Sequence, residues 1–175
     1  MPTNMRREIN EIPEAAERLL TQSHGVLQAT GKALRERDPD FLITIARGSS
    51  DHAAHFLKYA IEQQAGRAVA SIGPSLASIY GKSLKLDRAA AISISQSGKS
   101  PDIVALAQSA TQAGALTISL TNTKPSPLSD ACAHPVDINA GPELAVAATK
   151  SFFNSVLAGL AILSEWTLDT ELQKS

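Results

Sequence analysis

The sequence predicts an α/β fold, a three-layer αβα sandwich with a five-stranded parallel sheet, preceded by an N-terminal helical extension. Short apolar runs rich in β-branched residues alternate along the chain with longer segments of helical periodicity. The apolar runs are continuous, as in strands covered on both faces, and do not alternate as half-exposed strands do. Together these patterns favour parallel strands joined by crossover helices in an open sheet of the flavodoxin or Rossmann type.

The N-terminal segment, residues 1–37, is expected to be helical and to pack on the domain that follows. Apolar residues recur at helical spacing through residues 5–37. Pro13 lies inside this pattern and indicates a helix start or a kink. Residues 38–168 are expected to form a single α/β domain, and residues 169–175 a polar tail.

The order of elements in the domain follows from the same patterns. The expected strands are residues 41–46, 68–72, 89–94, 115–120 and 134–138. The expected helices between and after them are residues 51–64, 101–113 and 144–166. Gly66 and Gly114 follow two of these helices, at the position where glycine commonly ends a helix.

Composition excludes several classes of protein. The 175 residues carry a net charge of −1, with 19% charged and 43% hydrophobic residues. Without a basic excess, a nucleic-acid surface is not expected. No apolar stretch follows the charges near the N-terminus, so we expect neither a signal peptide nor a membrane span, and a cytoplasmic protein. The single cysteine, Cys132, excludes an internal disulfide and a cysteine-cluster metal site.

Two histidines are the only hint of a metal site. His52 and His55 stand three residues apart on an expected helix and could share a face. No third ligand follows at a recognisable spacing, so two partly exposed helix histidines are the favoured interpretation.

The loop Ser95-Gln96-Ser97-Gly98-Lys99-Ser100 is the best candidate for a binding site. It leaves an expected strand and enters a helix that begins at Pro101. Hydroxyls, an amide and backbone N–H groups converge at such a helix start, where the helix dipole favours an anion. The competing interpretation for Ser100 is a simple helix N-cap, and the two roles are compatible. The loop matches neither a Walker A sequence nor GxGxxG, so nucleotide binding is not indicated.

Two further loops follow expected strands. Gly48-Ser49-Ser50-Asp51 opens a helix, and either a ligand contact or capping by Ser50 or Asp51 explains its polarity. Residues 140–143 lead into the helix expected at 144–166. Glu143 and Lys150 are the only charges between Asp137 and Glu165. They form either a structural ion pair or part of a site.

The three loops together resemble the signature loops of the SIS (sugar isomerase) domain. The matching segments are Ala46–Ala54, Ser93–Gly98 and Glu143–Phe152, and the resemblance runs from about residue 6 to residue 166. The likeness is to the first SIS half of the isomerase module found in glucosamine-6-phosphate synthases. Within that group the chain is similar to stand-alone amino-sugar-phosphate isomerases or deaminases without a glutaminase domain.

The resemblance implies roles for individual residues. Ser95, Gln96, Ser97, Gly98 and Ser100 would hold the phosphate of a sugar phosphate. The sugar would contact Gly48, Ser49, Ser50, Val146 and Ala148. Ser100 replaces the family's threonine and keeps the hydroxyl, whereas Ala148 replaces a serine and loses one side-chain contact. Lys99 stands where the synthase has glutamate, and is expected to be solvated.

The resemblance also implies what this chain lacks. The family's module has two SIS halves, and most acid–base residues belong to the second. We therefore expect the N-terminal half of a two-SIS isomerase or deaminase, with Glu143 as the one weak catalytic candidate and no metal or redox cofactor. Its expected partner is a second SIS domain or another copy of the chain. The alternatives are a complete single-SIS isomerase acting as an oligomer, with Glu143, His52 and His55 as its acid–base candidates, and a non-catalytic sensor of sugar phosphates.

Overall fold

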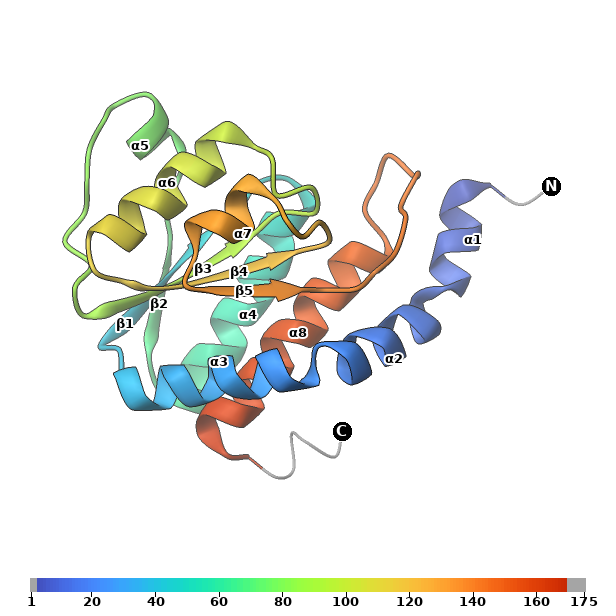
Figure 1. Ribbon diagram of the computed structural model, residues 1–175, viewed down its shortest axis with the longest axis horizontal. Helices are drawn as coiled ribbons and strands as arrows, with labels where there is room; N and C mark the ends of the chain where they lie inside the picture. The colour runs from blue at the N-terminus through green and yellow to red at the C-terminus, as the bar shows by residue number, and fades with distance from the viewer. Residues whose placement is uncertain (1–2, 170–175) are drawn as a thin grey trace.

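The computed structural model describes residues 3–169, and these form a three-layer α/β domain with helices extending from one end (Figure 1). The helices are α1 (Asn4–Asn10), α2 (Ile12–Gln22), α3 (His24–Arg37), α4 (Ser49–Ala65), α5 (Ser75–Ser78), α6 (Pro101–Gln112), α7 (Pro127–Ala131) and α8 (Lys150–Thr167). The strands are β1 (Phe41–Ile45), β2 (Ala68–Ser71), β3 (Ala89–Ile94), β4 (Leu116–Thr121) and β5 (His134–Asp137).

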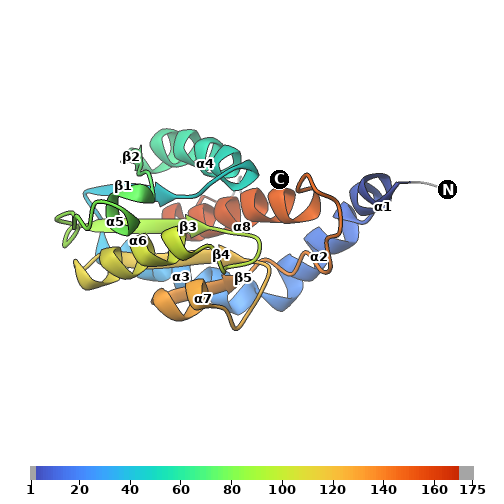
Figure 2. The ribbon, with the colours of Figure 1, turned by 90° about the horizontal axis from the view of Figure 1, so that it is seen from above.

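The sheet has the order β2-β1-β3-β4-β5, and every neighbouring pair is parallel. Helices α5, α6 and α7 cover one face, and α3, α4 and α8 cover the other (Figures 1 and 2). The predicted fold class, a five-stranded parallel sheet between two helical layers, is confirmed. All five expected strands are present with boundaries within two residues of those expected.

The N-terminal segment is helical as expected but divides into three helices. Pro13 lies in the first turn of α2, where its missing N–H is not needed by the helix. Arg18, Ser23 and Asn154 tie this segment to the domain, through bonds such as Asn154 Nδ2 to the carbonyls of Ala15 (2.9 Å) and Ile138 (2.7 Å). The polar tail predicted at 169–175 lies, after Asp169, outside the described residues.

The core lies on both sides of the sheet. Side chains alternate along β1, so that Leu42 packs among α3, α4 and α8 while Ile43 and Ile45 face α6. Two glycines allow α8 to approach its neighbours closely. A Cβ at Gly159 would lie 2.4 Å from Leu57 of α4, and one at Gly31 of α3 would lie 2.4 Å from the Cβ of Glu165.

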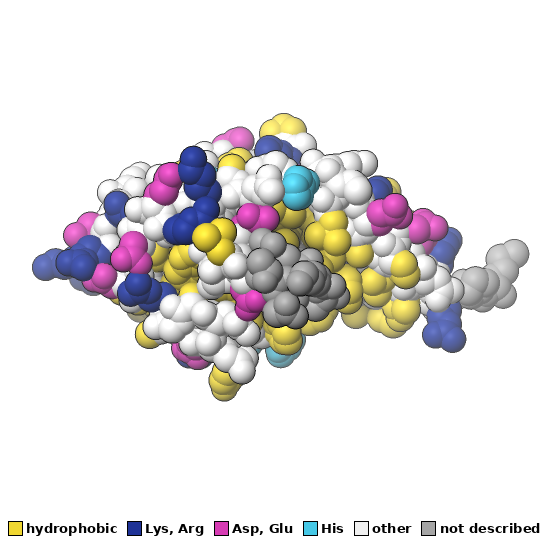
Figure 3. All heavy atoms as spheres, turned by 90° about the horizontal axis from the view of Figure 1, so that it is seen from below, with side chains coloured by type: hydrophobic (Ala, Val, Ile, Leu, Met, Phe, Trp, Pro, Cys, Tyr) yellow, Lys and Arg dark blue, Asp and Glu magenta, His cyan; other side chains and the backbone are white. Residues whose placement is uncertain are grey.

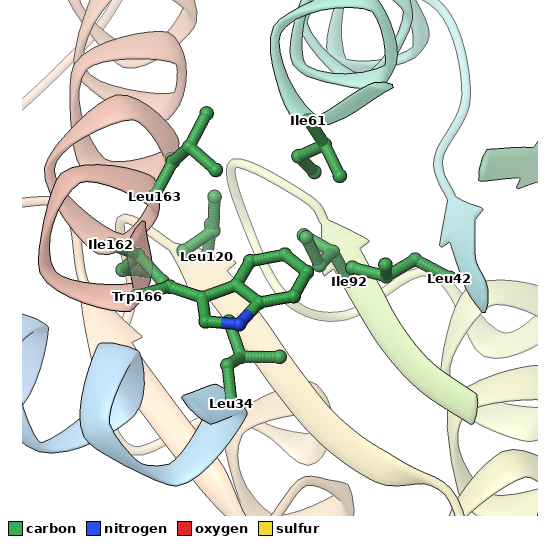
Figure 4. A pocket seen from close by; sticks show the side chains of 9 residues that line it. Leu34, Leu42, Ile61, Ile92, Leu120, Ile162, Leu163 and Trp166 are labelled. Atoms are coloured by element: carbon green, nitrogen blue, oxygen red, sulfur yellow. The ribbon is translucent and has the colours of Figure 1, made fainter. Parts of the chain in front are cut away.

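A small cavity remains between the sheet and α8 (Figure 4). It measures about 10 Å³ and is lined by Gly159 and by apolar side chains that surround the indole of Trp166. That volume suffices for at most one water, and an apolar lining offers such a water no partner. The cavity is a small packing gap, too small and too apolar for a sugar phosphate.

The largest difference from the expected elements concerns the last helix. Residues 144–166 were expected to be helical throughout, but α8 begins at Lys150. The amides of Leu144 and Ala145 donate to Glu8, and those of Thr149 and Ser151 donate to Glu143, so side-chain carboxylates hold an irregular loop there. Leu144 and Val146 are 69% and 107% exposed, which shows that the apolar pattern of this segment does not reflect burial. The short helices α5 and α7 were not expected at all.

Candidate ligand site at the carboxyl edge of the sheet

The three loops singled out from the sequence lie at the carboxyl ends of β1, β3 and β5. In the sheet, β1 lies between β2 and β3. The chain passes from β1 to β2 on one side and then crosses to β3 on the other side, so the strand order reverses between β1 and β3. Ligands of open parallel sheets bind at such a reversal point. The loops 46–48 and 95–100 leave these two strands, and the register pairs Ile45 with Ser93 just before them.

In the loop 95–100, two backbone amides donate hydrogen bonds to serine hydroxyls of the same loop. The N–H of Gly98 donates to Ser95 Oγ (3.2 Å), and the N–H of Lys99 donates to Ser97 Oγ (3.3 Å). Ser95 is 6% exposed, whereas Ser97 is half-buried. Two hydroxyls and two backbone N–H groups are therefore concentrated within the five residues 95–99, as an anion site requires.

Gly98 cannot be replaced without moving its surroundings. Its φ is +63°, and a Cβ there would lie 2.4 Å from Ser126 Oγ, 2.8 Å from Ser126 Cβ and 2.9 Å from Thr121 Oγ1. Its carbonyl also accepts the N–H of Leu128 (3.0 Å). Glycine at this position lets the loop turn against the start of α7.

The start of α6 presents unsatisfied donors beside this loop. Ser100 occupies the N-cap position in an extended conformation, but its side chain makes no capping hydrogen bond. Pro101 stands in the first turn as expected. The first N–H groups of a helix have no intrahelical acceptor, so the α6 start can donate to an anion. The simple capping role considered for Ser100 is thus not realised by its hydroxyl.

The β1 loop has a similar character. Gly48 is the N-cap of α4 with φ +56° and ψ −133°, a region open to glycine only, and no side chain caps the helix. Ser49 is exposed and Ser50 half-buried in the first turn. Capping by Ser50 or Asp51, the alternative to a ligand role, is therefore absent. An ion pair between Arg47 and Asp102 (2.5 Å) joins this loop to the start of α6.

Asn122, which sequence reasoning missed, connects the second loop to the third. Its backbone N–H donates to the carbonyl of Gln96 (3.1 Å), and its side chain bonds Gly141 O (2.8 Å) and the N–H of Ala140 (2.8 Å). The available signal was its position directly after β4, because polar residues at the carboxyl end of a parallel strand face the ligand edge. The three loops thus form one connected edge.

Glu143 and Lys150 do not pair with each other among the described residues. Lys150 is 2% exposed and binds Glu11 (2.5 Å) and the carbonyl of Pro142 (2.8 Å). Glu143 accepts from the N–H groups of Thr149 (2.9 Å) and Ser151 (3.1 Å) and from both of their hydroxyls. Burial opposes ionisation of Glu143, but the bonds from Ser151 and Thr149 outweigh it and lower the pKa of the carboxyl. The carboxylate is held at the start of α8.

The remaining titratable candidates are two histidines on α4 and the single cysteine. His52 and His55 are both exposed on α4, and the His55 ring lies 6.5 Å from that of Tyr59. Within residues 3–169 no three metal-ligating side chains come together. Burial raises the pKa of the Cys132 thiol to about 11, although the hydroxyls of Ser119, Ser93 and Thr117 offset part of the effect. His52 lies in the first turn of α4, directly after the first loop, whereas burial leaves the Cys132 thiol protonated and unreactive.

This fold and this edge define an open parallel α/β domain whose ligand loops gather at the reversal of strand order. The family model of the SIS domain matches residues 37–164, and the chain belongs to that family. It is 31% identical over 165 residues to glutamine–fructose-6-phosphate aminotransferase [isomerizing] of Staphylococcus epidermidis, a match covering 92% of this chain and 27% of the relative. The chain thus spans about a quarter of the length of the curated relatives it matches.

Solved structures agree. A proposed phosphosugar isomerase from Silicibacter pomeroyi DSS-3 superposes with a TM-score of 0.97 and 53% identity, over 99% of this chain and 53% of that one. The C-terminal domain of glucosamine-fructose-6-phosphate aminotransferase from Francisella tularensis gives 0.78 and 25%, over 99% and 51%. The predicted relationship to the SIS domain of the aminotransferase is confirmed. No helix in residues 3–169 has the length and apolar character needed to cross a bilayer.

Proposed function

We propose that the chain binds the phosphate of a sugar phosphate in the loop 95–100, as the N-terminal half of a two-SIS aldose–ketose isomerase or deaminase acting on hexose 6-phosphates or amino-sugar 6-phosphates. The observation that carries the proposal is the loop between β3 and α6. It offers the hydroxyls of Ser95, Ser97 and Ser100, of which the first two are oriented by the amides of Gly98 and Lys99, and an uncapped helix start at the reversal of strand order.

The sugar would lie between the first and third loops. In this proposal Gly48, Ser49 and Ser50 contact its hydroxyls from one side, and Val146 and Ala148 contact it from the other. The link through Asn122 supports a single ligand spanning the second and third loops, because it fixes Ala140 and Gly141 relative to Gln96.

The chain's part in catalysis would be anchorage. Isomerisation moves a proton between neighbouring carbons through an enediol or enolamine, and needs a base, a ring-opening acid and a donor to the developing oxyanion. Glu143 is engaged by two amides and two hydroxyls, which supports a structural role for it and a general base outside this chain. Binding energy from a held phosphate can position the reacting carbons and raise the rate.

A second SIS domain or another copy of the chain is the proposed partner, and the surface for it is the outward face of α8. Phe152 and Phe153 are 36% and 42% exposed, and Val156, Leu157 and Leu160 behind them are half-buried. Figure 3 shows hydrophobic side chains gathered on this side of the molecule. Since this chain covers 53% of the Silicibacter pomeroyi protein, the rest of that chain is long enough for a domain of similar size.

A cytoplasmic location fits the single buried thiol of Cys132.

Isothermal titration of glucosamine 6-phosphate and fructose 6-phosphate into the chain tests the binding role. The double substitution Ser95→Ala and Ser97→Ala should weaken binding at least about 100-fold, since it removes two hydrogen bonds to a charged group. Ser83→Ala, at an exposed serine outside the three loops, is the control and should change nothing. Unchanged affinity in the double variant would refute the phosphate site.

Activity and assembly test the rest. The chain alone should show little isomerase or deaminase turnover on these two substrates, and vigorous turnover would favour a complete single-domain enzyme instead. In sedimentation, the chain should self-associate or bind a second SIS domain, and Phe153→Asp should reduce that association. A monomer that binds no second SIS domain would contradict the role given to α8.

A further inference from the structure

The middle of the loop between β5 and α8 is held by a residue of the N-terminal helices and not by burial of its own side chains. Leu144 and Val146 are exposed, and a cleft of about 250 Å³ lies between α1 and the loop, lined by Arg7, Glu8, Glu11, Pro142 and Leu144. Figures 1 and 2 show α1 and α2 running alongside this loop beyond the edge of the sheet. Its conformation therefore depends on polar contacts.

Glu8 makes the central polar contact. Its carboxylate accepts hydrogen bonds from the N–H of Leu144 (2.5 Å) and the N–H of Ala145 (3.1 Å). It also lies 3.3 Å from the Thr149 hydroxyl. It is 2% exposed, and within the described part of the chain no lysine, arginine or histidine nitrogen lies within 4 Å of it. A buried carboxylate without a cation needs neutral donors, and here two of them are amides of one loop.

Other N-terminal residues hold the two ends of the same loop. Arg18 donates to the carbonyls of Asn139 (3.3 Å) and Ala140 (3.2 Å), and the buried Lys150 pairs with Glu11. The Lys150 bond lowers the pKa of the Glu11 carboxyl. Glu8 thus acts at the middle of a segment whose ends are fixed, next to Val146.

The phosphate loop has different supports. Its bonds outside the loop itself go to Leu120, Thr121 and Asn122 at the end of β4, to Leu128 in α7 and to Val104 in α6. None of the bonds found within residues 3–169 joins loop 95–100 to α1 or α2. Asn122 supports both loops at Gln96 and at Ala140–Gly141, but the bonds of Glu8 reach only the third loop and none of the supports of the phosphate loop.

We propose that Glu8 is a positioning residue that presets the loop 140–149 for the sugar, so that the N-terminal helices determine recognition of the sugar part and not of the phosphate. This rests on the proposed function of the same site. When the loop is no longer held, only a fraction of molecules has it in the binding conformation, and the affinity for the sugar phosphate falls by that fraction. An anion that touches only the loop 95–100 is unaffected.

The test compares two ligands, glucosamine 6-phosphate and inorganic phosphate, by isothermal titration against the unmodified chain, Glu8→Gln and the control Glu14→Gln. Glu14 is exposed on α2 and belongs to the same N-terminal segment. Glu8→Gln should weaken glucosamine 6-phosphate binding about tenfold or more while inorganic phosphate binding stays within about twofold. Glu14→Gln should match the unmodified chain with both ligands.

Equal losses for the two ligands, or no loss for the sugar phosphate, would overturn the proposal. If Glu8→Gln does not fold, hydrogen exchange of the unmodified chain decides. The amides of Leu144 and Ala145 should be protected from exchange, and those of Val146 and Ala147 should exchange fast. Fast exchange at all four amides would overturn the role of Glu8 in holding the loop. If the unmodified chain binds neither ligand, the proposed function fails, while hydrogen exchange still decides whether Glu8 holds the loop.

Discussion

Replacing Gly98 with alanine should destabilise the protein by two separable effects. An alanine at φ +63° adopts a left-handed conformation, which costs about 1–2 kcal/mol. Its Cβ would also lie 2.8 Å from Ser126 Cβ, and a clash with a packed atom adds about 1–3 kcal/mol. Ser126 cannot simply rotate away, because its side chain and that of Ser129 cap the start of α7 reciprocally.

Gly66→Ala supplies the matched control for this prediction. Gly66 has nearly the same φ, +64°, but no atom lies within 4 Å of the Cβ that would be added. It should therefore show only the conformational cost of about 1–2 kcal/mol, against about 2–5 kcal/mol for Gly98→Ala. Urea denaturation of both variants measures the free energies of unfolding. Equal destabilisation would refute the close packing of Gly98 against Ser126.

Three other substitutions or conditions give distinct expectations. Because burial raises the pKa of the Cys132 thiol to about 11, the folded protein should have roughly 100-fold less thiolate at neutral pH than an ordinary thiol. Iodoacetamide should therefore modify Cys132 only after unfolding, and rapid modification of the native protein would contradict its burial. Leu163→Ala should enlarge the cavity near Trp166 and cost about 2–5 kcal/mol in urea denaturation, while Leu20→Ala at an exposed site should stay within about 0.5 kcal/mol. Because the folded pKa of Glu143 is lowered, its stabilising effect is present above its usual pKa of 4.5 and is lost as pH falls through the folded value. The difference in unfolding free energy between the unmodified chain and Glu143→Gln should therefore shrink as the pH falls below 4.5, and a pH-independent difference would contradict the ionised, hydrogen-bonded carboxylate.

The strands were predictable from the sequence because burial on both faces imposes a continuous apolar run, as in residues 41–45 and 89–94. The loop 95–100 was identifiable for a local reason. Its serines, Gly98 and the helix start at Pro101 lie within seven residues, so one short segment of sequence carries the pattern.

The start of α8 was not predictable in the same way. Leu144 and Val146 continue the apolar pattern of the helix, and only the bonds that backbone amides donate to Glu8 and Glu143 show that the backbone is irregular there. Glu8 and Leu144 are 136 positions apart in the sequence, and no local pattern reveals such a contact. The bridging role of Asn122 and the pairing of Lys150 with Glu11 were not predicted from the sequence for the same reason.

The glycines that bring α3 and α4 against α8 have a consequence for assembly. Gly31 and Gly159 have no side chains to separate the helices, so α8 packs closely against both α3 and α4. Such close packing leaves α8 little freedom to shift. Its outward row of phenylalanine, valine and leucine is thereby presented on a backbone that is already fixed. A partner docking on that row would lose little affinity to reorganisation of the surface it meets, since the ordering was completed when the chain folded.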